Sequence, residues 1–159
     1  MSDLRNYISQ IKKIKELKTI KTKVSTKYEI AGVTAKVDGS DAVLFENIKE
    51  SDFNLISNLV GTRKRFAIAV GGTEDNIHAK VISAIKKAKR PKIISSGKFM
   101  ENKSKNIFSM PIVSHFKKES GPFITSSVAY AKNPETGKQN SSFHRMMPID
   151  KTHFSIRMV

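Results

Sequence analysis

The C-terminal segment 122–159 constrains the fold more than any other part of the chain. Two runs of alternating apolar and polar residues, 122–130 and 153–159, lie on either side of the segment 133–145. A period of two is typical of strands with one buried face, and Asn-Pro-Glu-Thr-Gly at 133–137 is typical of a turn. We therefore expect strand, turn and strand. Asn140 and Arg145 lie five residues apart, so an extended chain places them on opposite faces unless a bulge or bend intervenes.

Length and composition indicate an ordinary globular chain. With 159 residues, 38% of them apolar, it can form one domain or two small ones around a modest core. There is no apolar run of about eighteen residues and no apolar stretch at the N-terminus, so we expect a cytoplasmic protein without a membrane partner. The absence of cysteine excludes disulfides, thiolate nucleophiles and cysteine-ligated zinc.

The charge is strongly basic, with 29 Lys and Arg against 14 Asp and Glu and a net charge of +15. Such a balance raises nucleic acid or another polyanion as a partner. The lysines occur nearly everywhere, with concentrations at 12–27 and 86–105, and no aromatic residues are interleaved to stack on bases. We therefore disfavour specific nucleic-acid binding, and favour a solvated lysine-rich surface or a surface that faces an acidic partner.

The first half of the chain alternates between helical and extended patterns. A helix is expected from residue 4, because apolar residues recur at helical spacing after a capping Ser2 or Asp3. The clearest element is a helix from a Thr73 cap to about Lys89, preceded by a structural turn at Gly71-Gly72. The other expected elements are a strand at 19–24, a short helix at 29–35, strands at 42–45 and 54–59, and either a strand or a buried helix at 63–70.

The pattern changes after the helix that follows Thr73. Residues 91–106 are polar and lysine-rich and read as a linker or an exposed loop, whereas β character dominates from Ile107 onward, with no obvious place for a helix. We therefore expect an α+β chain with a small N-terminal α/β domain at 1–106 and a second, β-rich region at 107–159.

Several short motifs occur in the order in which one enzyme family has them. They are Glu29-Ile30, Leu44-Phe45-Glu46-Asn47, Asn58-Leu59-x-Gly61-Thr62-x-Lys64-Arg65, Met110-Pro111-Ile112, Pro122-Phe-Ile-Thr, Asn133-Pro-Glu-Thr-Gly and Asn140-x-x-x-x-Arg145. Together they resemble the UbiD-type decarboxylases, which use prenylated FMN. The resemblance favours a helix at 63–70, and implies that 107–159 is the start of a split β-barrel cofactor domain of the flavin-reductase-like kind, incomplete in this chain.

The resemblance also implies roles for individual residues. Decarboxylation requires an electron sink, a grip on the carboxylate and a proton donor, and in this family prenylated FMN is the sink. A divalent metal, usually manganese, holds the cofactor phosphate, and potassium is a further candidate ion. The matching positions make Asn140 a metal ligand and Arg145 the catalytic residue beside the flavin. The implied cofactor contacts are Phe143, His144, Arg145, Arg157, Met158 and Val159.

The residue types agree with these roles. An amide oxygen is a suitable ligand for a hard cation, and a guanidinium holds a carboxylate through two parallel hydrogen bonds. Considered alone, Asn140 is better explained as a turn or strand-end residue and Arg145 as a surface ion-pair partner, and only the surrounding motif favours the site roles. His144 and the Ser141-Ser142 pair depart from the family pattern, which leaves ring contacts and substrate open. His78, His115 and His153 have no partner at metal-ligand spacing and read as surface or loop residues.

Finally, the resemblance implies that this chain requires a partner. The family's catalytic acids and remaining metal ligands lie downstream of the matched region, so we expect an N-terminal part or a small subunit that a large subunit or the rest of the enzyme completes, in an oligomer. We expect Asn140 and Arg145, on neighbouring β segments, to converge on one flavin-phosphate pocket. The alternatives are a non-catalytic binding or regulatory module of the same fold and, less favoured, a basic nucleic-acid-binding protein. The substrate is left open between aromatic acids and a phosphorylated unsaturated aliphatic acid.

Overall fold

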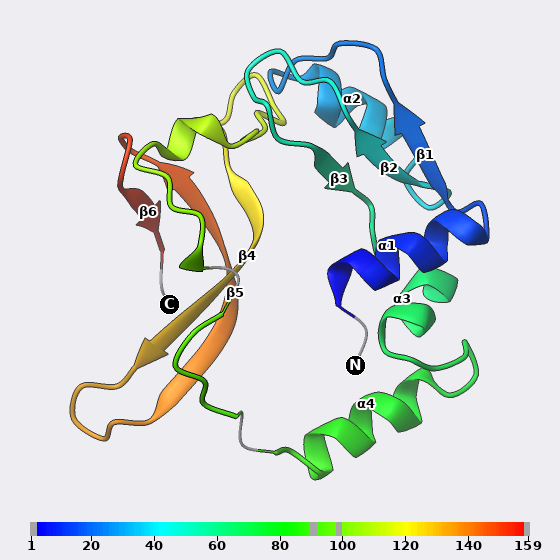
Figure 1. Cartoon of the computed structure of the whole chain (residues 1–159), viewed down its shortest axis with the longest axis vertical. Coiled ribbons are helices and arrows are strands. Elements are labelled where there is room, and N and C mark those ends of the chain that lie inside the picture. Colours follow the sequence, from blue (N-terminus) through cyan, green and yellow to red (C-terminus); the bar gives the residue numbers. More distant parts are fainter. Residues whose placement is uncertain (1–2, 90–91, 98–99, 158–159) are drawn as a thin grey trace. The chain divides into compact units, whose positions relative to one another are not determined.

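The computed structural model describes residues 3–89, 92–97 and 100–157, and the chain forms two compact units (Figure 1). The first consists of 1–22, 33–47 and 54–103, and the second of 23–32, 48–53 and 104–159. Each unit contains one three-stranded sheet. The chain is therefore a mixed α+β protein, as the sequence predicted.

The sheet of the first unit is built around its most apolar strand. β2 (Ala42–Phe45) lies between β1 (Leu17–Ile20) and β3 (Leu55–Ser57), and three of its four residues are buried. β1 and β2 are parallel, with Leu17 opposite Ala42, whereas β2 and β3 are antiparallel. A parallel pair requires a crossover connection, and α2 (Glu29–Lys36) lies in the segment that makes it.

Helices pack on this sheet through predicted apolar positions. α1 (Leu4–Lys13) is capped by Asp3, whose carboxylate accepts a hydrogen bond from the Asn6 amide at 2.8 Å. Its Tyr7 and Ile11 form a buried cluster with Ala42, against which Leu17, Leu59 and Ile68 pack. α3 (Arg63–Ala69) confirms the helix that the family resemblance favoured at 63–70, and α4 (Ile77–Lys86) follows it.

A buried arginine ties the first unit together. Arg65 is 0% exposed, and its Nη1 donates to the Glu16 carboxylate at 2.9 Å and to the Ser40 carbonyl at 2.5 Å, while Nη2 donates to the Asn58 carbonyl at 3.1 Å. Lys64 Nζ lies 2.8 Å from the other Glu16 oxygen. Hydrogen bonds from Lys64 and then from Arg65 lower the pKa of Glu16. Three segments distant in sequence therefore meet at one guanidinium.

The second unit is organised around an antiparallel sheet. β5 (Gln139–Pro148) lies between β4 (Ile124–Lys132) and the short β6 (Phe154–Ile156). The 3₁₀ turn η2 (Ile107–Ser109) is attached to this sheet's β5–β6 connection by the Ile107 amide, which donates to the Lys151 carbonyl at 2.7 Å. Earlier segments join through single bridges, Lys27 with Ser114 and Val113 with Phe123.

Several predicted boundaries are wrong. The strand expected at 19–24 lies at 17–20, because Leu17 packs on the Tyr7 cluster, and only Val24 makes a later bridge, to Ile48. The residues 107–113 do not begin the β region with a strand; they form η2 and a single bridge at Val113. The strands expected at 122–130 and 153–159 are found at 124–132 and 154–156 among the described residues.

The helix expected after Thr73 also differs from its prediction. Thr73 does not cap it; the Thr73 amide instead donates to the Asn76 side chain at 2.9 Å, and the helix starts after Asn76. It ends at Lys86 rather than near Lys89. Its apolar residues Ile77, Val81 and Ile85 recur every four positions; Ile77 is buried, but Val81 and Ile85 are exposed to 37% and 72%.

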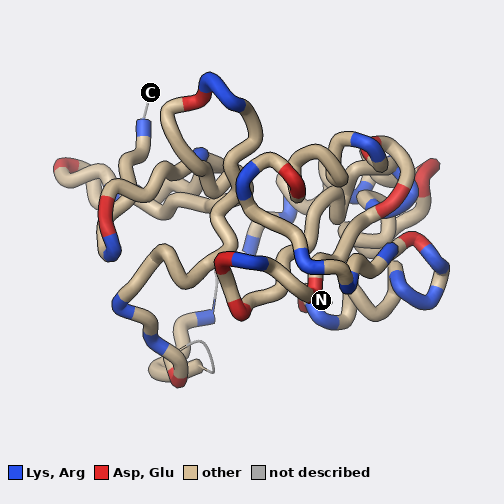
Figure 2. The backbone as a smooth tube through the Cα atoms, turned by 90° about the horizontal axis from the view of Figure 1, so that it is seen from above, with Lys and Arg blue, Asp and Glu red and all other residues tan. Residues whose placement is uncertain are grey.

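Lys and Arg positions occur along most of the backbone (Figure 2). Within the part of the chain that the structure describes, no helix is long and apolar enough to cross a membrane.

The Arg65 network predicts an asymmetric response to mutation. Glu16→Gln removes the carboxylate charge that faces the buried Arg65 guanidinium. We expect it to lower the free energy of unfolding by about 1.5–3 kcal/mol, the range for hydrogen bonds to charged groups. Lys64→Gln removes the other, exposed partner of the same carboxylate and should cost less than about 1 kcal/mol. Urea unfolding of the two variants measures the difference, and equal losses would contradict a central role for Arg65.

Candidate functional site

Four of the predicted site residues, Asn140, Phe143, His144 and Arg145, lie on a β-hairpin of the second unit. The turn between β4 and β5 is held by Asn133, whose side-chain oxygen accepts from the amides of Glu135 and Thr136 at 2.9 and 2.8 Å, and by Gly137 at φ +66°. A positive φ suits glycine because it has no Cβ. From this turn β5 runs without interruption from Gln139 to Pro148, so Asn140 and Arg145 belong to one strand.

A bulge in β4 decides which side chains share a face. Ile124 lies opposite Met146 and Ser127 opposite His144, so β4 has one extra residue between these two pairs. The extra residue lies across from Arg145. Beyond it the register is regular, with Val128 opposite Phe143 and Ala131 opposite Asn140.

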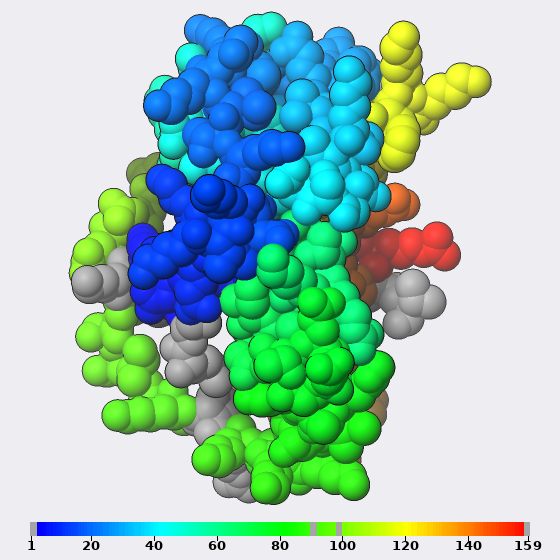
Figure 3. All heavy atoms as spheres, turned by 90° about the vertical axis from the view of Figure 1, so that its right-hand side faces the viewer, coloured from blue at the N-terminus to red at the C-terminus, as the bar shows by residue number. Residues whose placement is uncertain are grey.

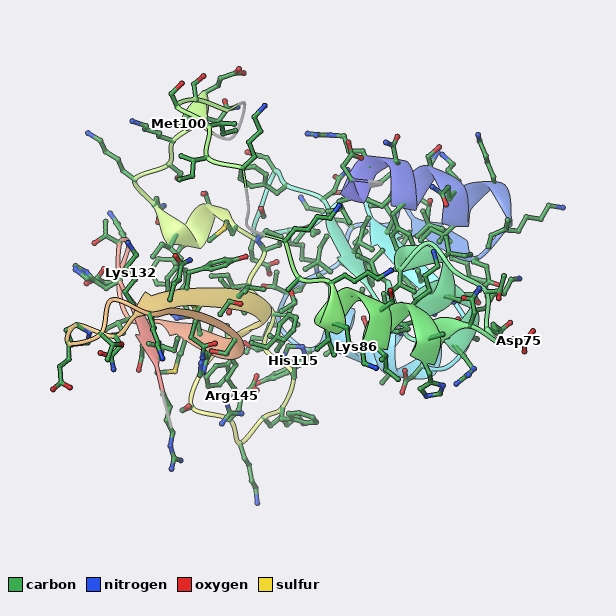
Figure 4. The ribbon with its side chains drawn as sticks, turned by 90° about the horizontal axis from the view of Figure 1, so that it is seen from below. Asp75, Lys86, Met100, His115, Lys132 and Arg145 are labelled. Atoms are coloured by element: carbon green, nitrogen blue, oxygen red, sulfur yellow. The ribbon has the colours of Figure 1, made fainter. Side chains whose placement is uncertain are left out.

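One face of the hairpin is exposed and combines aromatic, aliphatic and cationic groups. Phe143 is 81% exposed, with Val128 directly opposite it, and Tyr130 on the same face is 71% exposed. Arg145 follows two residues after Phe143, and its guanidinium carbon lies 5.0 Å from the centre of the Phe123 ring. This cation–π contact favours a position of the cation over the ring. Figure 4 shows Arg145 on this sheet, with His115 in the loop before β4.

Arg145 is available to a ligand. It takes part in none of the salt bridges found among the described residues, and it is exposed. The N–H donors of a guanidinium lie in its plane and remain free when an aromatic ring contacts its face. Arg145 can therefore bind a carboxylate through two parallel hydrogen bonds.

The other face of β5 carries Asn140, Ser142 and His144 in a row. Ser142 Oγ and His144 Nε2 are 2.7 Å apart, within hydrogen-bonding distance, and both residues are half-buried. The Ser127 hydroxyl on β4 donates to the His144 carbonyl. Neither the Ser142–His144 pair nor the contact of Arg145 with Phe123 was predicted from the sequence. The alternation along 141–145 places Ser142 and His144 on one face and so could have indicated their pair. The contact of Arg145 with Phe123 depends on the bulge in β4, which the sequence does not show.

The expectation that Asn140 and Arg145 converge from neighbouring segments onto one pocket is wrong for this structure. Both lie on β5, and an odd spacing on a regular strand places them on opposite faces. β6 pairs only with Met146–Pro148, so in the described part of the chain the edge of β5 from Gln139 to Arg145 has no partner on that side. A ligand that touches both residues must therefore pass around this open edge.

The remaining predicted residues lie near the end of the chain. Arg157 is exposed and follows β6 directly. Met158 and Val159 lie outside the described residues. Among the described side chains there is no group of three or more His, Asp or Glu that could hold a metal. Asn140 would therefore contribute a single neutral ligand to a site that needs others.

The β5–β6 turn contains the most perturbed carboxylate. The Asp150 side chain accepts from the backbone amides of Thr152 and His153 at 2.7 and 2.9 Å and lies 2.9 Å from His153 Nδ1. The Thr152 amide, and then the His153 ring, lower the pKa of Asp150 to about 2. His153, predicted to be an ordinary surface residue, is exposed and has this one ionic neighbour among the described residues.

This turn predicts a pH dependence. The folded pKa lies below the unfolded value of about 3.9, so the stabilisation is present above about pH 4 and is lost as the carboxyl protonates between about pH 4 and 2. Asp150→Asn keeps the acceptor oxygen but removes the charge. We expect the unfolding free energies of wild type and Asp150→Asn to differ most at about pH 5.5 and to converge towards about pH 2. A pH-independent difference in urea titrations would contradict this assignment.

Comparison with known families covers nearly the whole chain. The 3-octaprenyl-4-hydroxybenzoate carboxy-lyase N-terminal domain matches residues 8–85, and the Rift-related domain of the same carboxy-lyase matches residues 86–159. Together the two matches span residues 8–159. The chain belongs to the UbiD family, which confirms the resemblance seen in the sequence.

Individual relatives agree with this assignment. The chain is 31% identical to the anhydromevalonate phosphate decarboxylase of Methanothermobacter thermautotrophicus and 26% identical to one subunit of the 4-hydroxybenzoate decarboxylase of Chlamydia pneumoniae. These matches cover 98% and 99% of this chain, but 36% and 31% of the relatives. The chain therefore spans about a third of the length of the curated relatives it matches.

Solved structures show the same fold. HmfF of Pelotomaculum thermopropionicum, a UbiD-class enzyme in complex with FMN, superimposes with a TM-score of 0.90 at 23% identity, over 98% of this chain and 36% of HmfF. An evolved dimeric form of HmfF in complex with prFMN gives a TM-score of 0.92, also at 23% identity, over 100% of this chain and 39% of that form. The vanillic acid decarboxylase of Sedimentibacter hydroxybenzoicus gives 0.81 at 20% identity, over 99% of this chain and 36% of the enzyme.

Proposed function

We propose that this chain is the N-terminal part, or a small subunit, of a carboxy-lyase that decarboxylates an unsaturated or aromatic acid with prenylated FMN and a divalent metal. The family match over residues 8–159 carries the proposal. The exposed Phe143–Arg145 face supports it, because an apolar surface beside a stacked cation suits a planar ring and a carboxylate. The bound flavin would supply the electron sink that side chains lack.

Arg145 orients the substrate in this proposal. Its guanidinium lies 5.0 Å from the centre of the Phe123 ring and would bind the substrate carboxylate through two parallel hydrogen bonds. Phe143 and Val128 cover one side of the ring site and exclude water from it. His144 and Arg157, together with Met158 and Val159, would complete the contacts to the cofactor from this chain.

The metal is assigned to the opposite side of β5. We assign Asn140 as one oxygen ligand of a manganese ion that also binds the cofactor phosphate, with potassium as a further candidate ion. The unpaired edge of β5 provides the route by which one cofactor contacts Asn140 on one face and Arg145 on the other. The remaining ligands and the catalytic acids come from the rest of the enzyme, either the continuing chain or a large subunit.

We further propose that β4, β5 and β6 are the opening strands of a split β-barrel. Their unpaired edge and exposed Val128, Tyr130 and Phe143 are features that a closed barrel, a partner chain or an oligomer contact would cover. The relative from Methanothermobacter supports testing a phosphorylated unsaturated aliphatic acid as substrate before 4-hydroxybenzoate.

The role of Arg145 is tested in the assembled enzyme. Arg145→Ala should lower decarboxylation by roughly 10²- to 10³-fold, the cost of removing one preorganised charge-stabilising donor. Lys132→Ala, an exposed cation on the same hairpin, should leave the rate within about twofold. Full activity of Arg145→Ala would remove the assigned role, and no activity of the wild-type assembly on any acid tested would favour a non-catalytic module.

The role of Asn140 is tested by metal binding. With flavin present, Asn140→Ala should weaken Mn²⁺ binding to the assembled enzyme by at least about tenfold, because it removes a ligand of the ion. Gln139→Ala is the matched control, since it removes the neighbouring exposed amide from the other face of β5. Mn²⁺ titration followed by electron paramagnetic resonance measures both, and equal affinities would contradict the assignment.

A further inference from the structure

Helix α4 carries an apolar stripe that leaves the core of its unit partway along. Ile77, Val81 and Ile85 recur every four residues and therefore lie on one side of the helix. Their exposed fractions rise along the helix, from 6% to 37% and 72%. The stripe is therefore buried at Ile77 and exposed to solvent at Ile85. α4 lies at the surface of its unit (Figure 3).

The exposed end of the stripe borders a hollow. Its volume is about 600 Å³, and its apolar lining comes from Val70, Val81, Ala84 and Ile85. Lys80, Ser83 and Lys87 complete the lining. Lone exposed apolar side chains are ordinary on protein surfaces, whereas a continuous stripe bordering an apolar hollow is typical of a docking surface. None of the predicted site residues lines this hollow.

The charges beside the stripe are of one sign. Lys80 and Lys87 are seven residues apart, about 20° around the helix axis from each other, and form a row along one flank of the stripe. The segment 77–89 contains four lysines and no acidic residue. Figure 4 shows Lys86 in the last turn of α4 and Asp75 before its start. A second copy packed on this face would bring like charges together, so self-association is disfavoured.

We propose that the Val81–Ile85 end of α4 is the docking surface for an acidic amphipathic helix of a partner chain. The partner's apolar side chains fill the hollow against Val70 and Ala84. Its Asp or Glu side chains lie beside the apolar contact and face Lys80 and Lys87. Charged residues next to the apolar contact of a coiled coil form ion pairs between helices in the same way. The proposal accounts for the sequence pattern of 77–88, which the described part of the first unit leaves only partly buried.

A designed helix tests this surface on the full chain. The probe is a fluorescein-labelled peptide of about 20 residues with leucines at a and d positions and glutamates on the flanks; a second peptide has lysines in place of the glutamates. We expect the acidic peptide to bind in fluorescence anisotropy and the basic peptide to bind at least about tenfold more weakly. Ile85→Ser should weaken the binding of the acidic peptide by at least about tenfold, because it removes an apolar side chain that the peptide would bury.

Two matched variants make the result decisive. Ile149→Ser removes an isoleucine of similar exposure, 63%, from the second unit and should leave binding unchanged. The double variant Lys80→Glu, Lys87→Glu should reverse the peptide preference. It should bind the basic peptide and not the acidic one. Because these side chains are at the surface, circular dichroism should show wild-type folding. Equal binding of both peptides, equal loss with Ile149→Ser, or a dimer in sedimentation that Ile85→Ser abolishes would overturn the proposal.

Discussion

The pairing of β4 with β5 is the constraint on which the candidate site depends. One extra residue in β4 allows Ile124 and Ser127 to lie on the same face although they are three residues apart, and it lies across from Arg145. The strands beyond it alternate regularly, which separates an exposed aromatic and cationic face from a half-buried face of small polar groups. The chemistry available on each side of the sheet follows from this register.

Much of the architecture could be predicted from local patterns. The helices α1 and α4 carry apolar residues at helical spacing, and β2 is a short continuous apolar run bounded by polar residues. The motif order identified the family. Boundaries were less predictable where tertiary contacts decide them. Leu17 belongs to β1 because it packs on Tyr7 and Ile11, and Thr73 loses its capping role to a turn made by Asn76.

The strands that carry the candidate site residues could be predicted from the sequence, but the arrangement of these residues could not. The spacing of Asn140 and Arg145 already indicated opposite faces, and the expectation of convergence required a bend in β5 that the structure does not have. The bulge lies in the partner strand instead, where no glycine or proline marks it. Contacts such as Arg145 over Phe123 depend on cross-strand register, which a single sequence does not encode locally.

Arg65 also explains why the family motif from Asn58 to Arg65 contains several specific residues close together. A lysine in its place would offer one compact ammonium where a planar fork now spans a carboxylate and two carbonyls. Asn58 supplies one of those carbonyls from a left-handed backbone conformation at φ 54°, and a side chain at Gly61 would come within 3.2 Å of the guanidinium. The motif from Asn58 to Arg65 therefore reflects the fold. Proteins that share this motif share the fold, but they need not catalyse the same reaction.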